Sequence, residues 1–151
     1  MKRPPRASSP ALCQMVPSRM AEADSICLKI RTLLESQGLP QACFSVELLA
    51  RECLTNAMIH GNQLNVDKSV LFRLWIGQRW VRLQVTDEGP GFDWRKSCPA
   101  APDITKPHGR GLRICASYAE RVRFNRRGNQ ITLWIQKNPK GKDDGNGRFC
   151  H

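Results

Sequence analysis

The sequence predicts an α/β protein, a two-layer sandwich in which helices cover one face of a mixed, mostly antiparallel sheet. Three observations lead to this prediction. Two stretches near the start have the apolar spacing of amphipathic helices. Four later stretches alternate apolar and polar residues, as half-buried strands do, and short turns join them in pairs. The 151 residues are enough for one domain with a substantial hydrophobic core.

The first third of the chain contains the helical pattern. Residues 1–10 are rich in Pro, Ser and Arg and are expected to form a disordered basic tail, and residues 11–16, ALCQMV, suit a short edge strand. Residues 19–37 have helical periodicity that stops at the sequence Gly-Leu-Pro. A second helix is predicted from about residue 41 to residue 60, before Gly61.

The apolar period then changes from that of a helix to that of a strand. Residues 70–76 and 81–87 alternate and are predicted to form a hairpin. The segment 88–108 contains four prolines and two glycines, so we expect an irregular loop of the kind that is often functional. The last elements are predicted to be a helix at 111–120 and two strands joined by a turn, RVRFN at 121–125 and QITLWIQ at 130–136.

These boundaries give one domain at residues 11–137, followed by a flexible tail at 138–151. The formal net charge of +11 is compatible with nucleic-acid binding. However, basic residues gather in both tails, and neither an aromatic-rich RNA-binding motif nor a helix-turn-helix is recognisable. We therefore do not expect direct nucleic-acid binding. A basic surface suits an acidic partner or nucleotide phosphates equally well.

The lack of a recognisable targeting signal and the pattern of the cysteines both favour a cytoplasmic location. No apolar run approaches the ~18 residues of a membrane span, and the start lacks the apolar centre of a secretory signal. The seven cysteines are irregularly spaced and include no CxxC pair, so we expect reduced thiols that behave as small hydrophobes. No histidine lies near paired cysteines, which argues against a zinc site.

The second predicted helix carries polar residues on a line. In ECLTNAMIHGN, Glu52 and Asn56 lie one turn apart, at the rim of an apolar stripe that includes Cys53 and Ala57. They either form a half-solvated boundary pair or face something polar that the fold is built to hold. His60 is interpreted as part of the end of the helix.

Two glycine-rich segments follow strand and loop patterns. Asp87 continues the inward face of its strand, and a buried carboxylate is costly unless a group donates to it. Gly89 and Gly91 follow at once and permit close approach of the backbone. Taken alone, this segment is equally compatible with an ordinary strand that ends in an acidic turn. Further on, Gly109 and Gly111 immediately precede an apolar helix, a common but unspecific phosphate-site pattern.

In this order, the three segments resemble the three boxes of the GHKL (Bergerat-fold) ATP-binding domain, an Asn-bearing helix, a DxGxG loop and a GxG helix start. The phrase ECLTNAMIHGN is most similar to the anti-sigma-factor serine/threonine kinases of the RsbW and SpoIIAB type. The resemblance covers residues from about 11 to 137. It implies that ATP and Mg²⁺ are bound and that a lid at 92–108 closes over the nucleotide.

The resemblance also implies a role for each matching residue. Asn56 would offer its amide oxygen to Mg²⁺, and Glu52 would be the general base that takes a proton from the attacking hydroxyl. Asp87 would accept a hydrogen bond from the adenine amino group, while Gly89 and Gly91 would let the chain pass against the base.

Near the phosphates, the resemblance implies contacts from Gly109, Arg110 and Gly111, with Arg110 placed to offset charge during transfer. Asn129 stands where relatives often have a Thr near the adenine, and its amide can bond the same water or base edge.

The function implied by the resemblance is that of a serine/threonine-protein kinase in a partner-switching pathway. Its substrate would be a STAS-domain anti-anti-sigma-like protein, and its other partner a sigma factor. The length favours this reading over GHKL ATPases that need a further domain and over sensor histidine kinases. Relatives often form homodimers, but the sequence shows no interface to assign. The alternative is a non-catalytic, nucleotide-gated regulator that binds a protein partner.

Overall fold

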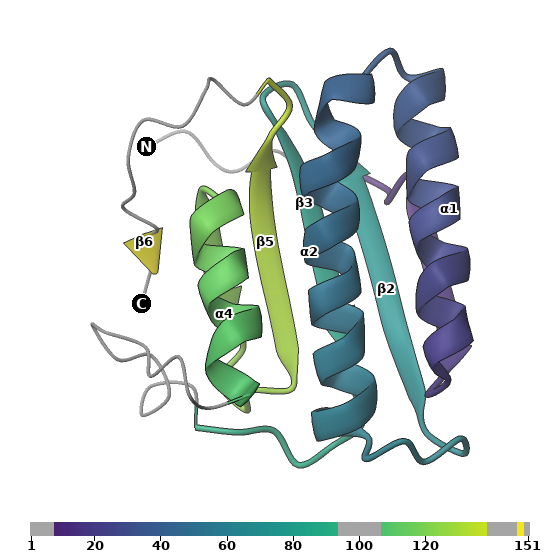
Figure 1. Ribbon diagram of the computed structural model, residues 1–151, viewed down its shortest axis with the longest axis vertical. Helices are drawn as coiled ribbons and strands as arrows, with labels where there is room; N and C mark the ends of the chain where they lie inside the picture. Colours follow the sequence, from purple (N-terminus) through teal and green to yellow (C-terminus); the bar gives the residue numbers. More distant parts are fainter. Residues whose placement is uncertain (1–7, 94–106, 139–147, 150–151) are drawn as a thin grey trace.

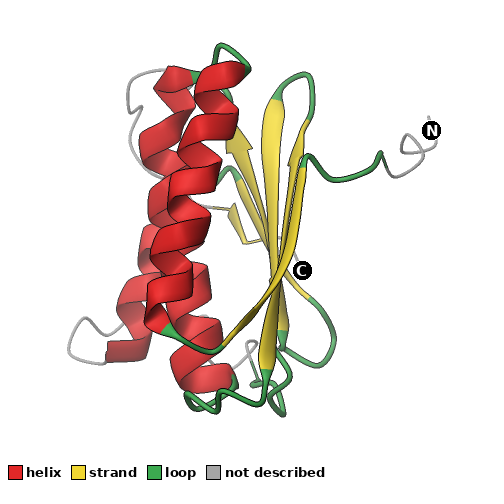
Figure 2. Cartoon of the chain, turned by 90° about the vertical axis from the view of Figure 1, so that its right-hand side faces the viewer, coloured by secondary structure: helices red, strands yellow, loops and turns green. Residues whose placement is uncertain are grey.

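The computed structural model describes residues 8–93, 107–138 and 148–149, with the backbone alone for residues 107–112 and 148–149. The described chain forms two layers, a sheet and a group of helices that pack on one of its faces (Figure 2). The predicted α/β two-layer sandwich is therefore confirmed. The expected tails and lid lie largely outside the described residues.

The sheet has six strands in the order β1-β2-β3-β5-β4-β6. All neighbouring strands are antiparallel except β6, which is parallel to β4, so the sheet is mixed and mostly antiparallel, as predicted. The expected edge strand is present as β1. The bounds of the strands are β1 Leu12–Pro17, β2 Ser69–Ile76, β3 Trp80–Thr86, β4 Arg121–Phe124, β5 Gln130–Gln136 and β6 Arg148–Phe149.

The helical layer begins with α1 (Met20–Ser36), which ends before Gly38 at a backbone φ of 70°. A short 3₁₀ turn, η1 (Pro40–Ala42), leads into α2 (Cys43–Asn56). The π-helical turn η2 (Ala57–Gly61) extends α2, so the helix predicted from about 41 to 60 is confirmed in two parts.

Two ion pairs connect α1 to α2 on the outer side of the helical layer. Arg31 donates two hydrogen bonds, of 2.9 and 2.7 Å, to the Glu47 carboxylate. Arg51 donates to Asp24. The opposite side of α2 is thereby left to the core.

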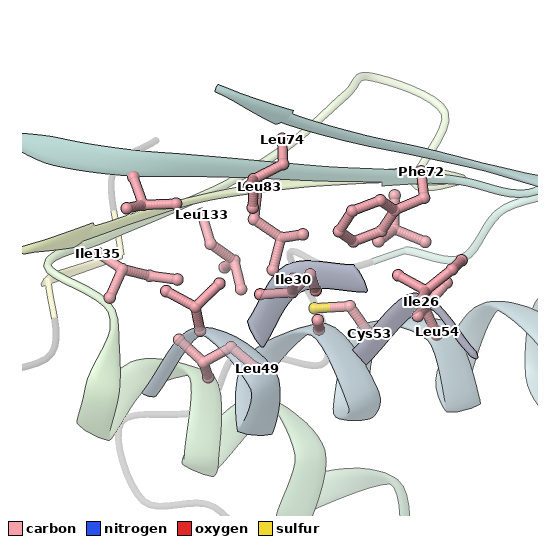
Figure 3. Packing of buried hydrophobic residues seen from close by; sticks show 14 of the residues in the cluster. Ile26, Ile30, Leu49, Cys53, Leu54, Phe72, Leu74, Leu83, Leu133 and Ile135 are labelled. Atoms are coloured by element: carbon pink, nitrogen blue, oxygen red, sulfur yellow. The ribbon is translucent and has the colours of Figure 1, made fainter. Parts of the chain in front are cut away.

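The core lies between the two layers (Figure 3). Strand residues at every second position point into it, because the side chains of a strand alternate between its two faces. Phe72 lies opposite Val85, and Leu74 lies opposite Leu83. These four residues are at most 2% exposed. From the helical layer, the labelled residues that meet them are Ile26, Ile30, Leu49, Cys53 and Leu54.

The third predicted helix begins earlier than expected. The helix α4 spans Pro107–Tyr118 rather than 111–120, so Gly109 and Gly111 lie inside its first turns and do not precede it. Proline and glycine in this segment suggested a loop. Pro107, however, is the first helical residue, where its missing N–H and fixed φ are tolerated.

Among the described residues, no helix is both long and apolar enough to cross a bilayer. The described cysteines, which are Cys13, Cys27, Cys43, Cys53 and Cys115, are all free thiols, as the sequence predicted. Cys53 and Cys115 lie with their sulfur atoms 3.9 Å apart, where α2 and α4 pack together.

Candidate functional site

Three segments that are far apart in sequence meet at one end of the sandwich, the lower end in Figure 1. They are the C-terminal end of α2 with η2, the loop after β3, and the turn between β4 and β5. The helix α4 ends beside the start of β4, at the opposite end, and its 12 residues rise about 1.5 Å each. Its N-terminus therefore returns toward the same lower end, so all the motifs of the sequence converge there.

Glu52 and Asn56 lie one turn apart near the end of α2, and both side chains are half-buried. Within the described part of the chain, neither side chain has a hydrogen-bond or ion-pair partner. The buried stripe beside them is Val46, Leu49, Ala50, Cys53 and Ala57, as predicted. An acid and an amide are thus held by a rigid helix at the rim of the core, with their polar atoms available.

The helix widens directly after Asn56. The N–H of Asn62 bonds to the carbonyl of Ala57, five residues earlier, at 2.8 Å. Such π-helical turns are rare in proteins, and those that occur are often found at functional sites. His60 lies in this turn, as expected for a helix-end residue.

Asp87 directly follows β3 and is half-buried, as the strand alternation predicted. Its Oδ1 accepts a hydrogen bond of 2.8 Å from the backbone N–H of Gly89. Burial raises the pKa of the Asp87 carboxyl, and the Gly89 N–H opposes this rise only in part. The described protein supplies no donor to Oδ2. Because no buried side-chain nitrogen or oxygen lacks a partner there, Oδ2 lies where solvent or a ligand reaches it.

The loop after β3 packs so closely on its neighbours that side chains are excluded. A Cβ at Gly61 would overlap the Asp87 carboxylate, and a Cβ at Gly89 would overlap the backbone of Gly61. Gly91, at a φ of 80°, packs against the Arg127 backbone in the β4–β5 turn. Three segments therefore meet backbone to backbone, and Asp87 is fixed between them.

Asn62 connects the same segments through its side chain, although the sequence did not single it out. It is 1% exposed and accepts a hydrogen bond of 2.8 Å from the N–H of Glu88. Its amide nitrogen donates to Ser18 Oγ and to the Ser69 carbonyl, at 2.9 and 3.0 Å. A buried amide with three partners fixes the loop after β3 to the end of η2.

Asn129 supports Asp87 from the other side. Its carbonyl accepts the Asp87 N–H at 2.9 Å, and its side-chain amide donates to the Asp87 carbonyl, also at 2.9 Å. Its Oδ1 accepts from the side chain of Asn125 at 2.7 Å. Asn125 Oδ1 in turn accepts from the backbone of the turn. The structure thus gives Asn129 a positioning role, and its second N–H and the second lone pair of Oδ1 have no partner among the described residues.

Gly109, Arg110 and Gly111 are described by their backbone alone. They lie in the first turns of α4, where N–H groups have no partner within the helix and point out of its N-terminus, toward the lower end of the molecule. The Arg110 side chain and the lid residues 94–106 lie outside the described structure.

A cation can be held here without a carboxylate cage. No group of three or more His, Cys, Asp or Glu side chains suited to a metal occurs in the described residues. Mg²⁺ commonly keeps several waters and takes one or two protein oxygens plus substrate phosphates. The available amide oxygen of Asn56 fits that donor set.

The sandwich, the accessible carboxylate oxygen beside closely packed glycines, and the polar pair on α2 are the features expected of a nucleotide-binding domain. Comparison with known families supports and narrows this class. The model of the histidine kinase-like ATPase domain family matches residues 16–137, so the chain belongs to that GHKL-type family of ATP-binding, kinase-like ATPase domains. A search of curated proteins gave no match.

Proposed function

We propose that the protein is an ATP-dependent serine/threonine-protein kinase of the anti-sigma-factor type, whose substrate is a STAS-domain anti-anti-sigma-like protein. The observation that carries the proposal is the pair Glu52 and Asn56, which lie one turn apart with no partner among the described residues. A domain that only binds a nucleotide needs Asp87 and Asn56 but has no use for an available carboxylate at residue 52.

In the proposed reaction, ATP lies with its adenine against Asp87, Gly89 and Gly91 and its phosphates toward Asn56 and the start of α4. The serine or threonine oxygen of the partner attacks the terminal phosphorus, so a new O–P bond forms. The bond from that phosphorus to the bridging oxygen breaks, and ADP leaves. Glu52 takes the proton of the hydroxyl. Mg²⁺, held by Asn56, would neutralise phosphate charge when bound.

The second part of the proposal concerns the partners. As in the type that the motif resembles, the protein would sequester a sigma factor or another target when the STAS protein is phosphorylated. It would act in the cytoplasm, which agrees with the free thiols of the described cysteines. The similarity of ECLTNAMIHGN to that kinase type supports both statements.

The experiment measures binding and transfer separately. Binding of a non-hydrolysable ATP analogue with Mg²⁺ is followed by calorimetry, and transfer from γ-labelled ATP is assayed on each STAS-domain protein of the source organism. Glu52→Gln should bind the analogue like the wild type and transfer at least 100-fold more slowly. Glu35→Gln, an exposed change of equal charge on α1, is the matched control and should leave both values unchanged.

Two results would contradict the proposal. Normal transfer by Glu52→Gln would exclude Glu52 as the base. Analogue binding without transfer to any STAS protein would favour the alternative, a non-catalytic, nucleotide-gated regulator that holds its partner.

A further inference from the structure

Among the described residues, the helices pack on one face of the sheet and no helix packs on the other (Figure 2). We call this second face the uncovered face. One described contact reaches it from outside the sheet, a hydrogen bond of 2.8 Å from the Trp75 indole N–H to the Ser8 carbonyl. The register of the strands places the residues of the uncovered face in rows, because residues directly opposite each other point to the same side. One row runs Arg73, Gln84, Thr132 and Arg123 across β2, β3, β5 and β4. The adjacent row, on the same four strands, runs Trp75, Arg82, Trp134 and Arg121.

This uncovered face is basic. The two rows contain four arginines, and the six strands contain neither aspartate nor glutamate. The ion pairs found among the described residues both join α1 to α2, so the guanidinium groups of Arg73, Arg82 and Arg123 have no carboxylate partner there. Unpaired guanidinium groups on a surface of one sign attract an anionic partner.

Two of the arginines are stacked on tryptophans. The Arg82 guanidinium lies 4.1 Å from the centre of the Trp75 ring, and that of Arg121 lies 5.0 Å from the centre of the Trp134 ring. A stacked guanidinium keeps its N–H edges available, and these edges match a carboxylate in a bidentate manner. The same stacking covers indole faces on which nucleic-acid bases would otherwise stack.

A hollow of about 380 Å³ lies in this face. Arg73, Arg82 and Arg123 line it together with both tryptophans, and Gln84 and Thr132 are hydrogen-bonded to each other there at 3.2 Å. Arg73 and Arg123 are three strand spacings apart, about 14 Å. An extended peptide covers that distance in about four residues, with alternate side chains directed to the same side.

We propose that the uncovered face of the sheet docks an acidic segment of a partner polypeptide, with carboxylates on Arg73, Arg82 and Arg123. Charge complementarity carries this proposal, and the stacked arginines favour carboxylates over nucleic-acid bases. The surface lies on the side of the sheet opposite to α2, so it goes beyond the proposed kinase site and does not rest on it.

The test uses the whole chain without nucleotide. The probe is a fluorescein-labelled peptide of six Glu-Ser repeats, in which an extended conformation directs every carboxylate to one side. A peptide of six Gln-Ser repeats and the single strand (dT)12 are the comparison probes. Binding is measured by fluorescence anisotropy, and quenching of tryptophan fluorescence reports contact with Trp75 and Trp134.

The face variant is Arg73→Glu with Arg123→Glu. The matched control is Arg19→Glu with Lys29→Glu, which changes the net charge equally at exposed positions of the helical layer. We expect the face variant to raise the Kd of the Glu-Ser peptide at least tenfold and the control to raise it less than twofold. The Gln-Ser peptide should not bind. The milder pair Arg73→Gln with Arg123→Gln should weaken binding in the same direction, and circular dichroism checks that each variant is folded.

Three outcomes would overturn the proposal. Equal weakening in the face variant and the control would mean that only net charge matters. Tighter binding of (dT)12 than of the peptide, lost in the face variant, would make the surface a nucleic-acid site. Failure of the wild type to bind the Glu-Ser peptide would show that the uncovered face does not dock an acidic segment.

Discussion

Asp87→Asn should weaken ATP binding while leaving the protein at least as stable as the wild type at neutral pH. The substitution keeps an oxygen that can accept the Gly89 N–H. At the other position it replaces the accessible Oδ2 by an NH₂ group, which would meet the adenine amino group as a second donor. A charge-assisted hydrogen bond is worth about 1.5–3 kcal/mol, so the Kd should rise roughly 10- to 100-fold.

The folding stability of Asp87→Asn should not fall together with its affinity for ATP. The reason is that burial raises the pKa of the Asp87 carboxyl above its usual 3.8. A carboxyl with a raised pKa in the folded state binds its proton more tightly there than in the unfolded chain. Its stabilising contribution is present at low pH and is lost as the pH rises from 3.8 through the folded-state pKa. The Asn variant lacks this loss, so its melting temperature at pH 7 should equal or exceed that of the wild type, and the difference should shrink on acidification.

The assay combines calorimetric titration with ATP and Mg²⁺ and thermal melts between about pH 3.5 and pH 7.5, a range that spans the ordinary carboxyl pKa. Asp67→Asn, an exposed residue before β2, is the control for the change in charge and should leave ATP affinity unchanged. Unchanged affinity of Asp87→Asn would refute the adenine contact. A large fall in melting temperature at pH 7 would instead show that Asp87 is structural, and the weakened binding would then have no bearing on recognition.

Two further predictions concern the scaffold around Asp87, and both are measured by chemical unfolding. Gly91→Ala should cost more than Gly38→Ala, because both glycines have a positive φ but only Gly91 lies against backbone. The left-handed conformation costs about 1–2 kcal/mol and the overlap about 1–3 kcal/mol more, so equal losses would argue against the close packing. Asn62→Ala should cost about 3 kcal/mol, from three hydrogen bonds of about 1 kcal/mol each. The exposed Asn65→Ala serves as its control, and a loss no greater than that of the control would show that the Asn62 contacts do not hold the loop.

Periodicity predicted the elements of this fold well, because burial and periodicity have the same physical cause. The alternation of Val81, Leu83 and Val85 identified the inner face of β3 and so placed Asp87 beside the core. The helical stripe on α2 likewise placed Glu52 and Asn56 at its rim. The predicted start of α4, at residue 111, was wrong. Pro107 can either end a loop or begin a helix, and local sequence does not decide between these two possibilities.

The polar supports of the site could not be predicted in this way. Asn62 bonds to Ser18 and Glu88, which lie 44 and 26 positions away, and Asn129 bonds to the Asp87 carbonyl across 42 positions. An asparagine near a turn is common for local reasons, so its residue type carries little information about distant partners. The signal available for Asn62 was its place directly after the motif helix, two residues beyond His60.

The two halves of the site are built by different means, and this difference bears on the proposed function. The half around Asp87 consists of backbone segments in contact at glycines, with a carboxylate between them, and it suits recognition of a flat base by shape and one hydrogen bond. The half on α2 consists of two side chains, Glu52 and Asn56, without partners among the described residues. It suits contact with substrate groups whose charge changes during a reaction. Under the proposed function, substitutions at Asp87 should therefore change mainly the affinity for ATP, whereas substitutions at Glu52 should change mainly the rate of transfer. A pure binding module would have only the first of these dependences.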